Sequence, residues 1–386
     1  MKILVFDLLF AQPLNGAKFH GGGEYIKSVF RNIVNYSFTS HEFHVCYNPD
    51  LFLDKWIIDI IKDKHINTHY VKSVHDIVTE LIELSQDNEV RFFTGMIYPY
   101  DSEIMPTNLT SIGVCHGIRP IEKLKDTETW RYESLRANVK EFLRQIIVPE
   151  KRLMAARKSF SILFSKFDII ITDSNHSAYS IKNHFPIESK NLDIRILYPP
   201  SKIVTNEVTP SKADKFIMMV SANRWLKNSF RGVQTLDRLY GKGYLKDIRS
   251  RIYGGFPIKM QNALKNKEMF DFYDYVSTED LEQAYCDCEV FFYPTLNEGF
   301  GLPPLEAMKY GKTCVISSVC SLPEVYGNAV YYVNPYDISE MEGRILQALE
   351  YHIEEKTIFD RVNYIQNKQI VDLDKLCQII INQELV

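Results

Sequence analysis

The sequence lacks a long apolar run, an excess of basic residues and the paired CxxC motifs of a zinc cage. Without about 18 consecutive apolar residues, no segment is expected to span a membrane. A formal net charge of -4 over 386 residues argues against a nucleic-acid-binding protein, because such proteins are usually basic. We therefore expect neither a membrane-spanning protein nor a nucleic-acid partner.

Disulfides are not expected either. The seven cysteines are odd in number, and the CxC pair Cys286 and Cys288 precedes an apolar run in which small half-buried residues are expected. Reduced thiols are typical of the cytosol, so we predict a cytoplasmic protein. Asp7 interrupts the apolar N-terminal stretch MKILVFDLLFAQP, and no basic leader or cleavage site of small residues follows it. This stretch predicts a first strand rather than a signal peptide.

Short apolar runs alternate with helix-length stretches along the whole chain. The runs are residues 2–6, 42–47, 91–95, 110–116 and 168–174, then 215–222, 250–255, 288–295, 313–318 and 329–333. Runs that are apolar on both faces and separated by helices indicate parallel sheets covered by helices. The stretch 201–214 has no apolar periodicity and is typical of a linker. We predict an α/β protein of two doubly wound, Rossmann-like domains facing across a cleft, residues 1–200 and 215–366.

One segment breaks the alternation of strands and helices. Residues 119–167 are predicted to be helical and hold twelve basic and six acidic residues, a local charge of +6. Two interpretations stay open: a solvated helix face, or a basic and partly apolar surface that meets an anionic membrane or a lipid diphosphate.

The stretch NEGFGLPPLEAM, residues 297–308, holds the strongest functional signal. It follows a predicted strand and precedes a predicted helix, so its loop lies at the carboxyl end of a parallel strand, where ligands gather. Gly299 and Gly301 allow the backbone to approach a ligand, and the helix start favours an anion such as phosphate. Glu298 at the strand end and Glu306 in the first helical turn are natural acceptors for sugar hydroxyls. The spacing therefore suits a nucleotide sugar.

A second loop supplies positive charge. The run KFIMMVSA leads into NRWLKNSF, where Arg224 and Lys227 precede a helix that Asn228 or Ser229 can cap. Because two cations at a helix N-terminus oppose the helix dipole, they indicate a bound anion, and a diphosphate fits.

Two loops of the first half complete the predicted site. The glycines of FHGGGEY precede a helix and favour a phosphate or acceptor loop, although a glycine triplet alone is also compatible with a plain flexible loop. His116, in GVCHGIRP, ends a predicted strand and is expected at the same cleft. Its imidazole can donate a hydrogen bond to a sugar hydroxyl or stabilise developing positive charge.

Taken together, these motifs resemble the retaining glycosyltransferases of the GT-B architecture, family 4. The resemblance is most specific in FYPTLNEGFGLPPLEAMKYGKTCVISSVCSLPEVYGNAVYYVNPYD, which includes the E-x7-E pair, and in VSANRWLKN, RIYGG and VSTEDLEQAYCDCEV. In the first half HGGGEY, VCHG and ITDSNHSAYSIK match more loosely, and the Arg-to-Lys spacing of the second loop is shorter than in many members. By this resemblance a final helix, residues 367–386, packs back on the first domain.

The resemblance also implies roles for the residues. Arg224 and Lys227 would neutralise the donor diphosphate, Glu306 would hold the ribose, and Glu298 would contact hydroxyls of the donor sugar. The backbone amides of Phe300, Gly301 and Leu302 would assist at the sugar. In the first half His116 would line the sugar site, and Gly22 and Gly23 would lie near the phosphates and the acceptor.

The implied reaction moves a hexose from GDP-mannose or from a UDP- or dTDP-sugar to a glycan or lipid-linked glycan. The resemblance further implies bacterial surface polysaccharide synthesis, no metal or cofactor, and peripheral contact with the inner face of the membrane. Three alternatives stay open: a glycoside hydrolase, which also uses two carboxylates but needs no cations, a sugar-nucleotide epimerase, and a catalytically silent subunit that binds sugar nucleotides.

Overall fold

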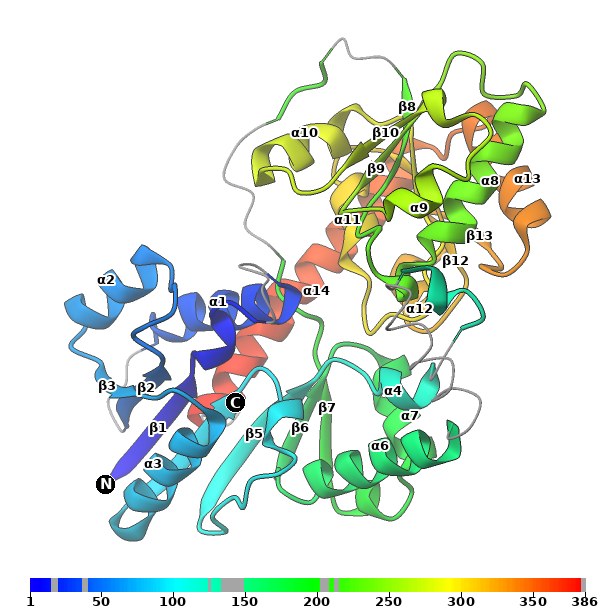
Figure 1. Ribbon diagram of the computed structural model, residues 1–386. Coiled ribbons are helices and arrows are strands. Elements are labelled where there is room, and N and C mark those ends of the chain that lie inside the picture. Colours follow the sequence, from blue (N-terminus) through cyan, green and yellow to red (C-terminus); the bar gives the residue numbers. More distant parts are fainter. Residues whose placement is uncertain are drawn as a thin grey trace. The chain divides into compact units, whose positions relative to one another are not determined.

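The computed structural model describes residues 1–14, 20–36, 41–123, 126–132, 149–201, 208–211 and 215–382. The chain forms two compact units, each built on a parallel sheet with flanking helices (Figure 1). Unit 1 comprises Met1–Ile118, Ala155–Ile203 and Gln366–Val386, and unit 2 comprises Arg119–Met154 and Val204–Ile365. The prediction of two α/β domains with parallel sheets is confirmed.

Unit 1 has a seven-stranded sheet in the order β3-β2-β1-β4-β5-β6-β7, and all its strands are parallel. Its strands are β1 (Lys2–Asp7), β2 (Glu42–Tyr47), β3 (Asn67–Tyr70), β4 (Glu89–Thr94), β5 (Leu109–Cys115), β6 (Ile169–Thr172) and β7 (Asp193–Ile196). Its helices are α1 (Gly21–Ile33), α2 (Lys55–Asp63), α3 (Val74–Asp87) and α7 (Asn175–His184), with short turns η1 (Leu9–Ala11), η2 (Tyr98–Tyr100) and η4 (Glu188–Lys190). Helix α6 (Pro149–Phe164) begins in the part of the chain that belongs to unit 2.

Unit 2 has a six-stranded parallel sheet in the order β10-β9-β8-β11-β12-β13. Its strands are β8 (Phe216–Met219), β9 (Arg249–Tyr253), β10 (Phe270–Tyr273), β11 (Val290–Tyr293), β12 (Thr313–Ser317) and β13 (Tyr331–Val333). Its helices are α4 (Arg119–Glu122), α8 (Ser229–Gly241), α9 (Ile258–Gln261), α10 (Thr278–Asp287), α11 (Leu302–Met308), α12 (Leu322–Tyr326) and α13 (Ile338–Glu350), with turns η3 (Thr129–Tyr132), η5 (Trp225–Lys227) and η6 (Lys267–Met269).

Both sheets reverse their strand order once, between β1 and β4 in unit 1 and between β8 and β11 in unit 2. In doubly wound sheets ligands bind beyond the carboxyl ends of the two strands at this reversal, because the loops there diverge to opposite faces. In unit 2 these are the loops that follow Met219 and Tyr293. They are the two loops that the sequence motifs single out.

Three strands were not predicted from the sequence: β3, β7 and β10. Each lies at an edge of its sheet. Their residues NTHY, DIRI and FDFY are mostly part-exposed, so they lack the continuous apolar character of the interior strands. An edge strand is paired on one side only and is held by tertiary contact more than by its own sequence.

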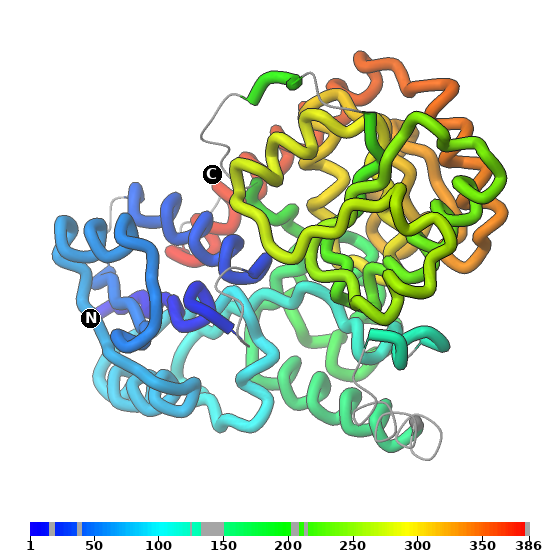
Figure 2. Tube along the Cα trace, turned by 45° about the horizontal axis from the view of Figure 1, so that its top comes forward, coloured from blue at the N-terminus to red at the C-terminus, as the bar shows by residue number. Residues whose placement is uncertain are grey.

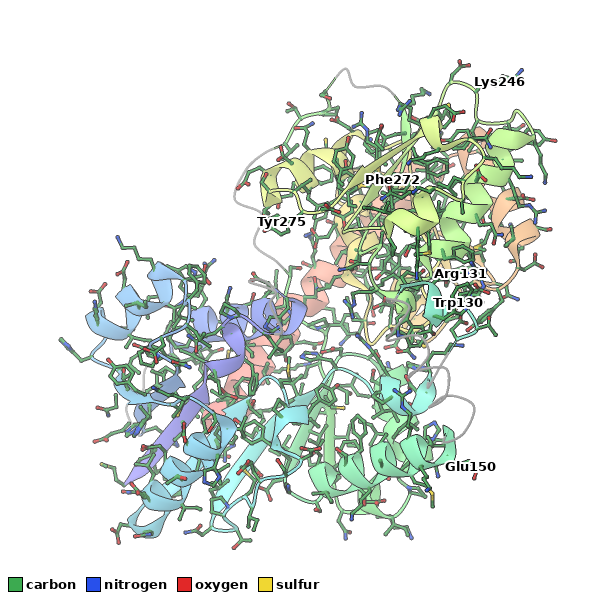
Figure 3. The ribbon with its side chains drawn as sticks, in the orientation of Figure 1. Trp130, Arg131, Glu150, Lys246, Phe272 and Tyr275 are labelled. Carbon is green, nitrogen blue, oxygen red and sulfur yellow. The ribbon has the colours of Figure 1, made fainter. Side chains whose placement is uncertain are left out.

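The segment Arg119–Met154 groups with unit 2, whereas we placed it within a continuous first domain. The reason is a set of polar contacts with α8. Arg231 Nη1 donates to Asp126 Oδ1 at 2.9 Å, and the Phe230 N–H donates to the Tyr132 hydroxyl at 2.7 Å. Figure 3 shows Trp130 and Arg131 beside each other among the side chains of unit 2. Most of the predicted helix 130–148 and part of the +6 segment lie outside the described residues.

The last helix, α14 (Glu355–Ile381), is 27 residues long and contributes to both units. Its C-terminal part packs in unit 1, where the red end of the chain lies among the blue N-terminal elements (Figure 2). The buried Arg91 of β4 donates to the carbonyl oxygens of Ile380 and Ile379 at 3.0 and 2.7 Å. Asp372 accepts from the N–H of Tyr198 at 2.9 Å. A cation at the last carbonyls also complements the helix dipole.

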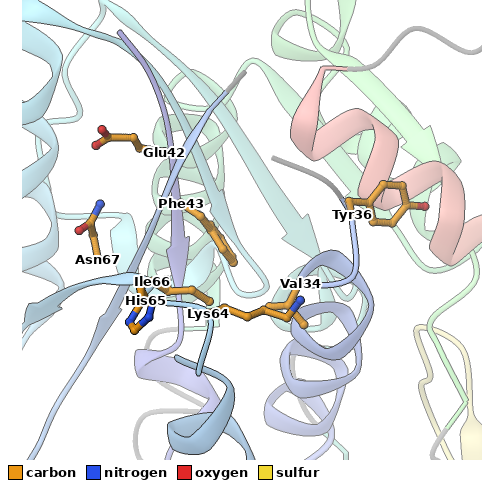
Figure 4. Close-up of a pocket in the computed structure, with 8 residues that line it drawn as sticks. All are labelled: Val34, Tyr36, Glu42, Phe43, Lys64, His65, Ile66 and Asn67. Carbon is orange, nitrogen blue, oxygen red and sulfur yellow. The ribbon is translucent and has the colours of Figure 1, made fainter. Parts of the chain in front are cut away.

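A pocket of about 420 Å³ opens in unit 1 (Figure 4). Its walls include Glu42 and Asn67, the first residues of β2 and β3. The pocket therefore lies at the amino ends of the unit 1 strands. The predicted site loops of this unit, which follow β1 and β5, lie at the opposite, carboxyl ends. Separately, none of the helices among the described residues is long and apolar enough to cross a membrane.

Candidate functional site

The loop after β11 holds Glu298 in a dense set of hydrogen bonds. Its Oε1 accepts from Lys227 Nζ at 2.5 Å, from the Tyr293 hydroxyl at 2.7 Å and from Thr295 Oγ1 at 2.9 Å. Only 4% of Glu298 is exposed. Among the described residues none donates to its other oxygen, Oε2. Three donors on one oxygen fix the orientation of the carboxylate and leave the second oxygen for a ligand.

The charge of this carboxylate is set by its surroundings. Burial alone would raise the pKa of Glu298, but the positive charges of Lys227 and Arg119 act in the opposite direction. Together with the hydrogen bonds from Lys227 and Tyr293 they lower the pKa of Glu298 to about 2. Glu298 is therefore an ionised acceptor across the whole physiological pH range.

Lys227 comes from the loop after β8, the other loop at the strand-order reversal. It is 7% exposed, and its Nζ also donates to the Tyr293 hydroxyl at 2.5 Å. Burial lowers the pKa of Lys227, and the nearby charge of Arg224 lowers it further, while Glu298 opposes both effects. The structure thus brings together one predicted phosphate ligand and one predicted sugar ligand, as a buried ion pair.

Arg224 is exposed and lies at the start of η5. Its guanidinium forms no ion pair with a described residue. Asn228 occupies the cap position of α8, but in a left-handed conformation with φ 55°, and its side chain does not cap the helix. Its Nδ2 donates instead to the Pro335 carbonyl at 2.7 Å. Of the two predicted phosphate ligands, only Arg224 presents its charge on the surface.

Helix α11 begins as predicted, with Gly301 before it and Pro303 and Pro304 in its first turn. Gly301 has φ 88°, and a Cβ there would lie 2.5 Å from Leu322 Cδ2, so the turn requires glycine. The N–H of Leu305 donates to the Tyr326 hydroxyl at 3.1 Å. Pro303 and Pro304 have no N–H group to offer. The N–H groups of Gly301 and Leu302 donate to no described residue, so they remain available for a ligand.

Two other residues of this stretch were predicted to bind the donor: Glu306 and, through its backbone amide, Phe300. Glu306 is the fifth residue of α11, past the first turn, because the helix begins at Leu302. It pairs with Lys309, whose Nζ lies 3.3 Å from Glu306 Oε2. The side chain of Phe300 is buried, so only its backbone is placed to meet a ligand.

His116 follows β5 in unit 1. Its Nδ1 lies 2.7 Å from Asp173 Oδ2, and its Nε2 lies 3.0 Å from the carbonyl oxygen of Gly95. Both neighbours accept hydrogen bonds, whereas a neutral imidazole donates only one. A ligand that takes a hydrogen bond from Nε2 has to replace the carbonyl of Gly95.

The glycine triplet lies inside α1 rather than before it. His20 caps the helix, because its Nδ1 accepts from the Gly23 N–H at 3.1 Å. Burial lowers the pKa of His20, which keeps this nitrogen available as an acceptor. A Cβ on Gly22 would lie 2.7 Å from Met96 Cε, and one on Gly23 would lie 3.2 Å from the carbonyl oxygen of Phe10. The triplet allows α1 to begin close to the loops after β1 and β4.

Several residues of the site were missed from the sequence. Tyr293 and Thr295 were predicted as ordinary strand residues. Their hydroxyl groups, five and three positions before Glu298, are the signal that could have identified them as its hydrogen-bond donors. Asp173 and Arg119 carry no local signal. In unit 1 the pairing of β5 with β6 brings Asp173 beside His116, and in unit 2 the docking of Arg119–Met154 brings the charge of Arg119 near Glu298. Asp7, at the end of β1, is fully buried, and burial raises its pKa to about 6.

The chain is similar in sequence to known proteins. Residues 204–368 match the model of the family described as glycosyl transferases group 1. The O-antigen chain mannosyltransferase B of Escherichia coli is 47% identical over 76 residues, which cover 20% of this chain and 20% of that protein. The serotype-specific mannosyltransferase WbdA of Escherichia coli is 25% identical over 299 residues, 74% of this chain and 36% of WbdA. The chain thus spans only a fifth to about a third of the length of these relatives.

The fold is also similar to solved structures. The sucrose-phosphate synthase of Thermosynechococcus elongatus superposes with a TM-score of 0.66 at 12% identity, over 98% of both chains. The chain therefore has the fold of the GT-B glycosyltransferases, and its residues 204–368 match the glycosyl transferases group 1 family.

Proposed function

We propose that the protein is a glycosyltransferase that moves mannose, with retention of configuration, from GDP-mannose to a glycan or lipid-linked glycan. The assignment of mannose is supported by the names of the relatives, which are O-antigen or serotype-specific mannosyltransferases. A UDP- or dTDP-hexose is the alternative donor. By the same relatives, the product belongs to a bacterial surface polysaccharide.

One observation carries the proposal: the ion pair of Lys227 and Glu298 at the strand-order reversal of unit 2. A buried ion pair costs desolvation that its mutual attraction repays only in part, so it is weak evidence for stability alone. A nucleotide diphosphate sugar offers each member a partner. Its diphosphate takes the ammonium, and a sugar hydroxyl takes the carboxylate.

For the remaining residues we propose the roles that the resemblance and their chemistry suggest. Arg224 reaches the diphosphate from the surface, and the N–H groups of Gly301 and Leu302 donate to its oxygens. Glu306 accepts from the ribose after release from Lys309, and His116 donates to the sugar or acceptor. The leaving diphosphate is stabilised by these cations and amides, so the reaction needs no metal ion.

The acceptor side is proposed on chemistry alone. A lipid-linked acceptor would bring the protein to an anionic membrane surface, and the basic residues of the 119–167 segment suit such contact. We place the reaction at the cytoplasmic face, where nucleotide sugars are available.

The test is thermal stabilisation by a panel of nucleotide sugars, followed by assay of sugar transfer. Arg224→Ala is the informative variant, because this exposed side chain makes no ion pair with a described residue and its loss should leave the fold intact. We expect GDP-mannose to stabilise the wild type and to bind the variant roughly ten- to a hundredfold more weakly, the loss of one charge-assisted hydrogen bond. Arg344→Ala, an exposed arginine on α13 of the same unit, is the matched control.

Three outcomes have different meanings. Stabilisation without transfer to any glycan would favour the silent-subunit alternative, and interconversion of the nucleotide sugar without acceptor would favour the epimerase. Absence of binding by every nucleotide sugar would contradict the proposed function.

A further inference from the structure

Asn297, the residue before Glu298, is held by an unexpected partner. It is 3% exposed, and its Nδ2 donates to Glu122 Oε2 at 2.8 Å and lies 3.2 Å from Cys320 Sγ. Glu122 comes from α4, at the start of the segment that groups with unit 2. No sequence motif links these two residues, which are 175 positions apart.

The other end of the same amide is unusual. Asn297 Oδ1 is buried, yet it accepts no hydrogen bond from a described residue. Exchanging the positions of Oδ1 and Nδ2 of the Asn297 amide would not give Oδ1 a donor, because the carboxylate of Glu122 only accepts hydrogen bonds and requires the NH₂ group to face it. Large majorities of buried polar side-chain atoms are paired, so an orphan acceptor indicates a missing donor.

The position of Glu122 is itself well fixed. The next residue, Lys123, donates from Nζ to the Tyr336 hydroxyl and lies 4.8 Å from the centre of that ring. Asp126 accepts from Arg231 on α8. The segment is thus tied to the rest of unit 2 at two residues that closely follow Glu122 in the chain, the residue that orients the amide.

We propose that Asn297 contacts the donor, its Oδ1 accepting a hydrogen bond from a hydroxyl of the transferred sugar, and that Glu122 is the positioning residue that orients the amide. The inference rests on the proposed function, and it adds a sugar-recognition pair that the E-x7-E motif does not contain. The inference also assigns a function to the segment Arg119–Met154, which supplies the Glu122 carboxylate that orients the amide oxygen of Asn297 toward the ligand.

The test compares dissociation constants for GDP-mannose and for GDP, which lacks the sugar. Asn297→Ala should weaken GDP-mannose binding roughly three- to tenfold, the value of a neutral hydrogen bond, and leave GDP binding unchanged. Asn262→Ala, at an exposed asparagine of the same unit, should change neither constant. Arg224→Ala should weaken both ligands alike.

A rescue separates orientation from simple packing. Asn297→Asp sets two carboxylates against each other and should weaken GDP-mannose binding more than Asn297→Ala does. Adding Glu122→Gln lets the new amide donate to the new carboxylate, whose second oxygen still accepts from the sugar. The double variant should recover GDP-mannose binding to within about threefold of the wild type.

Equal loss of GDP and GDP-mannose binding in Asn297→Ala, or no loss of either, would overturn the inference while leaving the proposed function intact. So would failure of the double variant to recover. If the wild type binds a UDP- or dTDP-sugar instead, the same comparison is made with that sugar nucleotide and its nucleoside diphosphate. If it binds no sugar nucleotide, the proposed function fails and this inference falls with it.

Discussion

At the scale of single residues, the sequence could identify which residue types matter but not which partners they take. Arg224 and Lys227 are three positions apart, and both were predicted to bind phosphate. One is exposed and the other buried against Glu298. The burial of Lys227 depends on contact with Glu298, which is 71 positions away in the chain, so no local sequence pattern predicts it. The partners Tyr293 and Thr295 were overlooked for the same reason, since each is also an ordinary strand residue.

Glu298 should make stability depend on pH in a defined direction. Its pKa falls from the ordinary 4.5 to about 2 on folding, so its contribution is present above about pH 4.5 and is lost as the pH falls toward 2. The full contribution is on the order of 3 kcal/mol. In Glu298→Gln this contribution is absent. The difference in unfolding free energy between wild type and variant should therefore narrow as the pH falls from about 5 to about 3.

Urea unfolding at a series of pH values measures this difference. Glu354→Gln, which removes an exposed carboxylate, serves as the control and should run parallel to the wild type. A gap between wild type and Glu298→Gln that stays constant from pH 6 to pH 3 would mean that the carboxylate is not stabilised by its cations.

At the scale of elements, the sequence predicted the interior strands of both sheets and the edge strand β13, and it missed the edge strands β3, β7 and β10. Interior strands are buried on both faces, and their apolar runs reveal this directly. By contrast β10 has Asp271 in its middle, where the carboxylate pairs with Arg249 of the neighbouring strand at 2.7 Å. Its pairing depends on that neighbour. Helix starts were harder to predict. The glycine triplet was expected to form a loop before the helix, yet the cap by His20 and close packing keep it within α1, although glycine is a poor helix former.

Two glycines of unit 2, Gly301 directly before α11 and Gly343 inside α13, should respond in opposite directions to substitution by alanine. Gly301 has φ 88° and its Cβ would collide with Leu322, so Gly301→Ala should destabilise the protein by about 1–3 kcal/mol. Gly343, inside α13, has open space around its Cβ, so Gly343→Ala should stabilise by about 0.5–1 kcal/mol. Urea midpoints compare the two. Equal effects would show that the turn before α11 does not require its left-handed conformation.

At the scale of the whole molecule, the chain crosses between its units more often than the sequence indicated. Arg119–Met154 leaves unit 1 and returns at Ala155, and α14 gives its first eleven residues to unit 2 and the rest to unit 1. Parallel sheets with uninterrupted apolar strands are visible in a sequence, whereas the docking of a polar segment on the other unit is not. Its contacts, such as that of Arg231 with Asp126, join residues 105 positions apart.

Each unit has its own sheet and core, and the predicted donor residues Arg224, Lys227, Glu298 and Glu306 all belong to unit 2. We therefore expect calorimetry to resolve two transitions, since separate cores need not unfold together. GDP at about 100 times its dissociation constant should add roughly 2.7 kcal/mol to the unit that binds it. For units of this size that is a rise of about 5–10 °C in one transition.

Gly343→Ala identifies that transition, because its stabilisation falls within unit 2. The nucleotide and the variant should raise the same transition and leave the other in place. A nucleotide shift confined to the transition that Gly343→Ala does not move would place the diphosphate on unit 1 and contradict the roles of Arg224 and Lys227. A single transition raised by both would instead mean that α14, shared by the two units, couples their unfolding into one event.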